Sequence, residues 1–249
     1  MVDRDDISRL TSTTRTVLDE ARRDLMSLAA QFDLDNPAQV RDALIELVPM
    51  LVNEYGELAA VAAAEWYEDV RPVGGFTTQL ADVADEAAVR GSVQALAGGL
   101  WGDVPLDAIE QISASMERHI KYSSRATIAR NVAADPMRPR YGRVPKGAKT
   151  CAWCEMLASR GFVYVTEETA GIVEDHYHDD CECEIVCSWD ADQAHIAGYD
   201  PDSMYDRYLT ARQQLEAEGM PVPSDADIAA RMREIFPDQY TDGHIHEAA

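Results

Sequence analysis

The 249-residue sequence has no cysteine in its first 150 residues and no stretch of about 18 consecutive apolar residues. The missing apolar run excludes a membrane-spanning helix, and the N-terminal residues lack the apolar region of a secretory leader. We therefore expect the chain to be made in a cytoplasm and to have no membrane contact. Because thiols are kept reduced there, a cysteine cluster indicates metal binding or thiol catalysis before it indicates disulfides.

Basic residues are also scarce, with 22 Lys and Arg against 45 Asp and Glu, for a net charge of -23. A chain this acidic is not expected to coat nucleic acid, because phosphate binding requires Lys and Arg. The segment 118–149 differs, since its nine basic residues and one acid give it a net charge of +8. Such a run is either ordinary solvated surface or a contact for DNA or an acidic partner. The candidate contact residues are those just before the cysteines: Arg138, Arg140, Arg143, Lys146 and Lys149.

Internal repeats, a phosphate-binding loop and a dinucleotide-binding glycine pattern are all missing, which leaves the apolar periodicity as the main structural signal. Residues 14–32 carry apolar side chains at helical spacing, and a second helix is expected from Pro37, with Asn36 as its N-cap and an interruption or kink at Pro49. Further helices are expected at 77–100, at 105–136, from 202 and from 224, the last with Ser224 as N-cap.

Three prolines and two glycines in 136–149 end the helical pattern and predict a linker or extended arm. Two short β-branched or aromatic-rich runs, 162–165 and 183–187, predict strands. The fold is therefore expected to be mainly α, with a small zinc-stapled α+β module. The predicted domains are a helical domain at 1–135, the basic linker and zinc-binding module at 136–198, and C-terminal helices with a tail at 199–249.

The cysteines and one histidine form two short motifs. Cys151 and Cys154 make a C-x-x-C pair, and His178, Cys181 and Cys183 make H-x-x-C-x-C. Two paired half-sites at this separation are typical of structural Zn2+, because each short spacing lets two side chains converge on one ion. The sequence therefore predicts one tetrahedral zinc site.

Five candidate ligands compete for four positions. On an extended strand, side chains two residues apart lie on one face about 7 Å from each other, too far for both sulfurs to reach one zinc. We therefore expect Cys183 to be a substitute or neighbouring thiol, and His176 and Cys187 not to bind the metal. The expected ligands are Cys151, Cys154, His178 and Cys181.

Other uses of these thiols are less consistent with the sequence. A disulfide framework would require an oxidising compartment, and a thioredoxin-like pair would require a preceding strand in a βαβ unit. A catalytic zinc would require an open position and a general base, and neither H-E-x-x-H nor the deaminase motif order occurs. The alternatives to a structural role are a metal-dependent nuclease or hydrolase, and a zinc-dependent adaptor of a host cell.

The stretches "RYGRVPKGAKTCAWCEMLASRGFVY" and "HDDCECEIV" resemble the C-terminal region of the Mu F-like minor head proteins of tailed bacteriophages, particularly those of actinobacterial phages. The shared pattern is C-x-x-C, then a glycine before an aromatic, here Gly161, then H-x-x-C-x-C leading into a strand. A long helical part precedes it in that family, as here. This sequence has Asp179 and Asp180 where the family often has Pro and a small or polar residue, and Glu182 where Arg is common.

The resemblance implies a minor capsid protein with a role in head morphogenesis. Its expected partners are the portal protein and other capsid components, with a further contact to packaged DNA. The expected location is the host cytoplasm during assembly and then the capsid interior at the portal vertex. We expect no enzymatic activity, because the sequence shows neither a Ser, His and Asp arrangement nor a zinc-protease motif.

Overall fold

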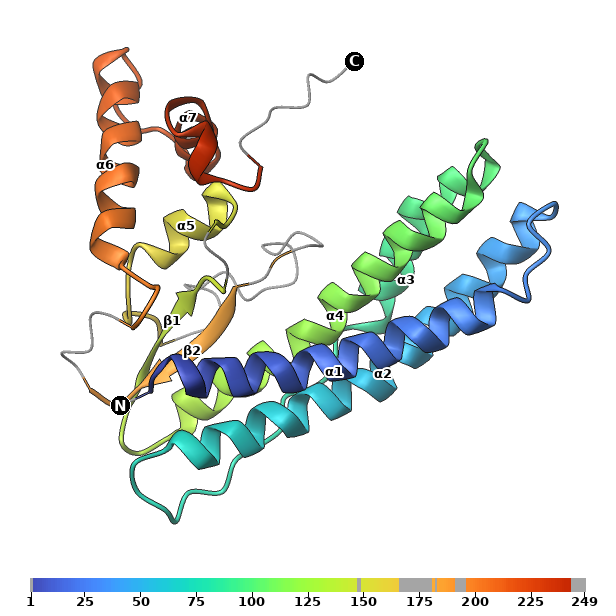
Figure 1. The fold of residues 1–249 in the computed structure, drawn as a ribbon, viewed down its shortest axis with the longest axis horizontal. Coiled ribbons are helices and arrows are strands. Elements are labelled where there is room, and N and C mark those ends of the chain that lie inside the picture. The colour runs from blue at the N-terminus through green and yellow to red at the C-terminus, as the bar shows by residue number, and fades with distance from the viewer. Residues whose placement is uncertain (1, 147–148, 166–180, 182, 191–195, 243–249) are drawn as a thin grey trace. The chain divides into compact units, whose positions relative to one another are not determined.

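A computed structural model describes residues 2–146, 149–165, 181, 183–190 and 196–242 (Figure 1). These residues form two compact units. We call Ser8–Asn131 the helical unit. The cysteine unit comprises residues 2–7 and the described residues from Val132 onward. The described parts of the zinc-binding and C-terminal segments, which the sequence separates at residue 198, therefore belong to one unit.

The helical unit is built from α1 (Arg4–Ala29), α2 (Pro37–Val70), α3 (Glu86–Leu96), the short 3-10 helix η1 (Ala97–Trp101) and α4 (Pro105–Ala134). The long helices α1, α2 and α4 run side by side in Figure 1. Each of these three helices places a stripe of apolar side chains against the others, because packing against another helix removes that stripe from water. The shared core includes Leu18, Leu25, Leu44, Val48, Val52, Val93, Ile109, Ile112 and Met116.

Helix α2 confirms its predicted start, because the Asn36 side chain accepts a hydrogen bond from the Gln39 backbone N–H. The predicted interruption at Pro49 is absent, and the helix continues through it to Val70. Proline removes only one N–H from the ladder. The neighbours Val48 and Val52 are buried in the core, and their packing holds both sides of the proline in one helix.

The helix predicted at 77–100 begins later than expected, at Glu86. Residues 77–85 form neither helix nor strand, and side chains of α4 bond their backbone. Asn131 accepts a hydrogen bond from the Gln79 N–H and donates one to the Gln79 carbonyl, and the Thr127 hydroxyl accepts one from the Ala81 N–H. Asp85 then caps α3 by accepting from the Ala88 N–H. Bonds to a distant helix thus replace the local helical bonds of this segment.

The cysteine unit contains β1 (Arg140–Val144), α5 (Ala152–Ala158), β2 (Glu184–Ser188), α6 (Pro201–Ala217), α7 (Asp225–Ile235) and the 3-10 helix η3 (Pro237–Gln239). Strands β1 and β2 pair antiparallel, in register from Arg140 with Ser188 to Val144 with Glu184. Helices α5, α6 and α7 share a second apolar core that includes Met156, Leu215, Ile228 and Met232.

Two predictions for this unit need correction. The expected linker at 136–149 contains β1, whose residues after Arg140 are buried. The expected strand at 162–165 is reduced to one bridge, between Tyr141 and Tyr164. The strand predicted at 183–187 is confirmed within one residue as β2, and the Ser224 cap is confirmed as a capping box with Asp227.

The described residues thus contain seven α-helices and one two-stranded sheet, which confirms the mainly α fold. None of these helices is both long and apolar enough to cross a membrane.

A contact between α1 and α2 gives the helical unit a pH dependence. The Tyr55 hydroxyl donates a hydrogen bond to Asp24, 2.6 Å away, and this bond is the main cause that raises the pKa of Tyr55 to about 12. The contribution to stability is complete below pH 10 and is lost as the pH rises towards 12, because the unfolded phenol ionises first. We expect Tyr55→Phe to destabilise the protein at pH 8, and the difference from wild type in urea unfolding to shrink between pH 10 and 12. A difference that stays constant over that range would contradict this assignment.

Candidate metal centre

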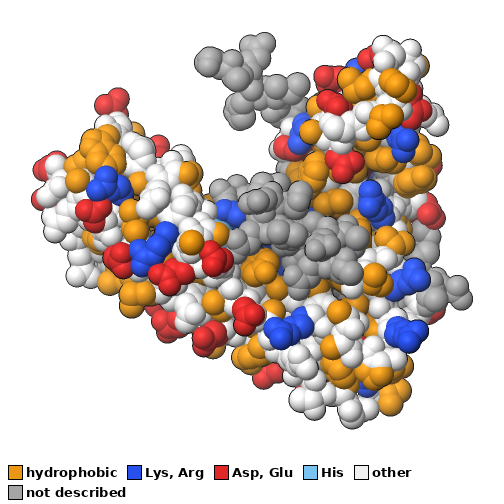
Figure 2. All heavy atoms as spheres, turned by 180° about the vertical axis from the view of Figure 1, so that it is seen from behind, with side chains coloured by type: hydrophobic (Ala, Val, Ile, Leu, Met, Phe, Trp, Pro, Cys, Tyr) orange, Lys and Arg blue, Asp and Glu red, His pale blue; other side chains and the backbone are white. Residues whose placement is uncertain are grey.

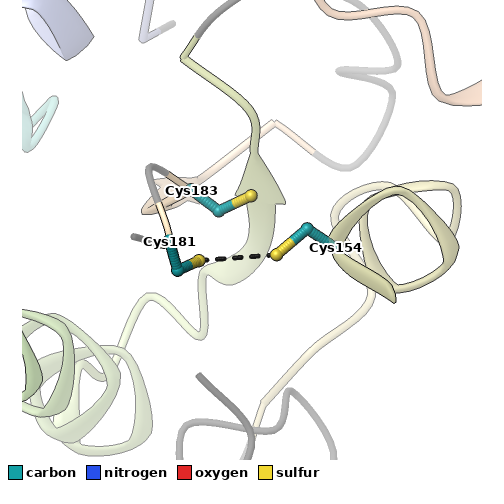
Figure 3. A group of neighbouring side chains, drawn as sticks. All are labelled: Cys154, Cys181 and Cys183. Carbon is teal, nitrogen blue, oxygen red and sulfur yellow. Dashed lines mark hydrogen bonds between the residues drawn. The ribbon is translucent and has the colours of Figure 1, made fainter. Parts of the chain in front are cut away.

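Three buried thiols meet in the cysteine unit. The sulfurs of Cys154, Cys181 and Cys183 lie within 4.8 Å of one another, and the Cys154 and Cys181 sulfurs are 3.4 Å apart. Figure 3 shows Cys154 extending from α5 towards the other two, which come from the segment before β2. In a tetrahedral site with Zn–S bonds of about 2.3 Å, two sulfurs lie roughly 3.8 Å apart. The size of the group therefore suits a metal ion.

Cys181 and Cys183 lie closer together than the sequence predicted. The expected separation of about 7 Å assumed that both residues lie on an extended strand. Strand β2 begins only at Glu184, so both cysteines precede it and the alternation of a strand does not apply to them. The expectation that distance excludes one of the two from the site is wrong.

Cys151 is not among the three sulfurs that all lie within 4.8 Å of one another. It is the N-cap of α5, and its sulfur accepts a hydrogen bond from the Cys154 N–H at 3.2 Å. Cys187 lies on β2, where it pairs with Tyr141, and burial raises the pKa of its thiol well above the ordinary value. The histidines of the motif, His176 and His178, lie outside the described residues, so their assignment stays a prediction.

Helix α5 is short, and side chains complete the hydrogen bonding of its last turn. The hydroxyl of Tyr164 donates to the Leu157 carbonyl at 2.7 Å, and the hydroxyl of Tyr199 donates to the Ala158 carbonyl at 2.6 Å. Burial raises the pKa of both phenols, so both remain donors at neutral pH. Gly161 follows with φ +67, a left-handed conformation that explains the glycine of the motif. These contacts fix the helix that carries Cys154.

Arg143 is buried beside the thiols. Its side chain is fully removed from solvent, and one guanidinium nitrogen lies 3.5 Å from the Cys154 sulfur and 3.8 Å from the Cys181 sulfur. Its predicted role in an exposed contact surface is therefore wrong. In a strand, side chains two residues apart share a face, and Tyr141 is also fully buried. Assigning 140–144 as a strand instead of a linker would have placed Arg143 on the buried face.

The other four predicted contact residues, Arg138, Arg140, Lys146 and Lys149, are exposed. Buried Asp135 holds the turn that leads to them, since its carboxylate accepts from the Met137 N–H and the Trp189 indole N–H. On the face drawn in Figure 2, Lys and Arg side chains are separated by acidic and apolar ones. We call the four exposed cations Arg138, Arg140, Lys146 and Lys149 the basic segment.

The grouped thiols are electrostatically unusual. Hydrogen bonding with Cys151 and Cys181, followed by burial, raises the pKa of Cys154 well above its ordinary value, although the charge of Arg143 opposes this shift. Hydrogen bonding with Cys154 and Cys181, followed by burial, raises the pKa of Cys183 in the same way. Without a bound metal ion, the thiols of Cys154 and Cys183 therefore stay protonated at neutral pH. A bound metal would displace their protons, as it does at thiolate sites.

The chemistry of the group follows from its atoms. Three sulfur ligands favour soft or borderline ions such as Zn2+ over Mg2+ or Ca2+, which prefer oxygen. None of the five cysteines, all of which the structure describes, is joined in a disulfide. The group is therefore a candidate metal centre held by thiols.

Comparisons with known proteins give the chain a family. The family model described as "VG15 protein" matches residues 1–211, a range that contains the candidate metal centre. The Gene 15 protein of Mycobacterium phage D29 is 33% identical over 95 residues, which are 36% of this chain and 34% of that protein. The aligned stretch thus spans about a third of that relative's length. No solved structure was found to match the chain.

The resemblance to Mu F-like minor head proteins is not tested by these matches and stays a prediction. The family match, in contrast, extends over most of the chain and includes the helical unit as well as both cysteine motifs. The chain therefore belongs to the VG15 protein family.

Proposed function

We propose that the chain is a bacteriophage structural protein that acts in head morphogenesis, and that one zinc ion holds its cysteine unit together. The family and the relative in Mycobacterium phage D29 support a phage protein. The observation that carries the zinc proposal is the group of three buried thiols beside a buried arginine.

The charge of Arg143 supports a metal held by thiolates. A buried cation is costly unless an opposite charge is close to it. Three thiolates around Zn2+ carry a net charge of about -1, which the adjacent guanidinium neutralises. Neutral thiols would stabilise the guanidinium charge less than thiolates do. The arginine thus fits the loaded site better than an empty one.

The burial of the site supports a structural ion over a catalytic one. The three sulfurs belong to residues that are only 1% exposed. A catalytic zinc keeps one position open for water or substrate and works with a general base. The metal-dependent nuclease or hydrolase therefore has less support. A structural ion also suits a unit with a short metal-binding helix and a two-stranded sheet, because metal binding supplies folding free energy that a small core lacks.

The fourth ligand comes from the two remaining candidates, Cys151 and His178. Cys151 is the N-cap of α5, and it is not among the described sulfurs that all lie within 4.8 Å of one another. We therefore favour His178, with Cys151 as the cap of α5.

Metal analysis tests the zinc proposal directly. We expect close to one zinc ion per chain, and we expect chelation to speed hydrogen exchange in 140–190 while most of the far-UV helical signal remains. The helical unit should persist because its apolar core contains no metal ligand. Reduced, folded and zinc-free wild-type protein would refute the proposal.

Single substitutions identify the ligands. Replacing Cys154, Cys181 or Cys183 by Ser should abolish stable zinc binding, whereas Cys187→Ser should retain it and serves as a control at another buried thiol. His178→Ala and Cys151→Ser decide the fourth position. If Cys151→Ser loses zinc and His178→Ala retains it, our choice of fourth ligand is wrong.

The role of Arg143 is tested by Arg143→Met, which keeps much of the apolar length and removes the charge. We expect zinc affinity to fall about 10- to 100-fold, the usual cost of losing a group that supports metal ligands. Arg143→Lys should bind zinc with intermediate affinity. Arg140→Met, on the same strand but exposed, should bind it like wild type. Equal affinities for Arg143→Met and Arg140→Met would show that the arginine does not stabilise the site.

We further propose that the protein associates with the portal inside the procapsid and that the basic segment contacts an acidic portal surface or packaged DNA. The turn at Asp135 and strand β1 hold this segment in a fixed direction beside the metal centre. Contacts of this kind weaken as salt is added. The portal as a partner and the capsid interior as a location are what the resemblance to minor head proteins implies.

Charge reversal tests the basic segment. The pair Arg138→Glu and Arg140→Glu should weaken binding to the true partner, with matched controls in Arg15→Glu and Arg23→Glu on α1, which change net charge equally. If duplex DNA is the partner, the slope of log affinity against log salt should fall by about 2, since each lost phosphate contact removes about 0.9. If the portal is the partner, only portal binding should weaken. If both variant pairs bind DNA and the portal equally well, the basic segment is ordinary surface.

A further inference from the structure

We propose that the C-terminal segment 240–242 positions the metal-binding helix α5, so that docking of this segment and metal binding strengthen each other. The inference rests on the proposed zinc site. We call the three residues Tyr240, Thr241 and Asp242 the C-terminal strap.

The strap forms a backbone hydrogen bond with Thr150, the residue immediately before the C-x-x-C motif. Tyr240 and Thr150 form a parallel bridge, and the Thr241 N–H donates to the Thr150 carbonyl at 3.0 Å. Thr150 directly precedes Cys151, and its hydroxyl oxygen lies 3.6 Å from the Cys183 sulfur. The strap therefore fixes a residue that contacts the thiol group itself.

Asp242 holds the first turn of α5. Its Oδ1 accepts from the Ala152 N–H at 3.0 Å, and its Oδ2 accepts from the Arg233 side chain at 2.7 Å. The first N–H groups of a helix have no partner within the helix, and Ala152 is fully buried. Without Asp242 this N–H would lose its partner away from water. Arg233 of α7 in turn holds the carboxylate in place.

Tyr240 bonds the middle of the same helix. Its hydroxyl donates to Oε1 of Glu155 at 2.8 Å, and Arg207 of α6 donates to both oxygens of that carboxylate at 2.6 and 3.0 Å. Glu155 is only 4% exposed and follows Cys154 directly. The strap thus contacts α5 on both sides of its metal-binding cysteine.

Metal and strap constrain the same residues, 150–155. A ligand that binds an already ordered site loses less conformational freedom, so each should favour the other, and the coupling must be reciprocal. The family match ends at residue 211, inside α6. The strap and α7 are therefore features of this chain beyond the matched region.

The 249-residue chain allows a direct test with zinc and, as a spectroscopic probe, Co2+. Asp242→Ala should weaken zinc binding about 10- to 100-fold in competition with a chromophoric chelator. Asp242→Asn keeps the oxygen that accepts from Ala152 and should recover part of this loss. Asp238→Ala, which removes an exposed carboxylate from η3, should match wild type. The thiolate-to-cobalt absorption should keep its position in all variants, because the ligands themselves are unchanged.

Hydrogen exchange tests the reverse direction. Zinc should slow exchange of the Thr241 N–H in wild type and should slow it much less in Asp242→Ala. Equal zinc affinity of Asp242→Ala and Asp238→Ala would overturn the inference, even if exchange elsewhere changed.

Two results separate this inference from the proposal beneath it. Wild-type protein that binds no zinc would refute the zinc site itself, whereas wild type that binds zinc with no effect of Asp242→Ala would refute only the strap. If Asp242→Ala fails to fold, Tyr240→Phe removes a single hydroxyl and should weaken zinc binding several-fold. Wild-type affinity in that variant would also overturn the inference.

Discussion

The cysteine unit depends on a buried guanidinium that lies against buried sulfurs. Arg143 reaches the sulfurs of Cys154 and Cys181 from strand β1, and its side chain is fully removed from water. Such a charge is tolerated only beside a compensating one. In the proposed function the compensation comes from thiolates on zinc, so the strand, the helix and the metal motif become parts of one electrostatic arrangement.

The two units rely on different forces. In the helical unit, α1, α2 and α4 bury long apolar stripes, and Gly56 brings α2 so near α4 that an added Cβ would lie 2.8 Å from the Ser123 hydroxyl. Hydrophobic burial and close packing hold these helices. In the cysteine unit, a seven-residue helix is held by directed polar bonds, from Tyr164, Tyr199 and Asp242. Directed bonds specify position more narrowly than apolar contact, which suits a site whose ligands must converge on one ion.

The basic residues of 118–149 include both buried and exposed side chains. Arg125 and Arg143 are inside the protein, whereas Arg138 and Arg140 are exposed. A net charge of +8 over 118–149 therefore overstates the cationic surface available to a partner. The proposed contact with a portal or DNA concerns the exposed cations of the basic segment alone, which are Arg138, Arg140, Lys146 and Lys149.

The sequence by itself determined the long helices α1, α2 and α4, the helices α6 and α7, the caps at Asn36 and Ser224 and the grouping of cysteines near one site. Periodicity, capping and ligand spacing are local properties. The tertiary structure alone decided three features. Residues 77–85 are not helical because α4 supplies hydrogen-bond partners for their backbone. Arg143 is buried because β1 pairs with β2, and Cys181 and Cys183 come together because β2 starts after them. Each depends on pairing or packing with a segment that is distant in sequence.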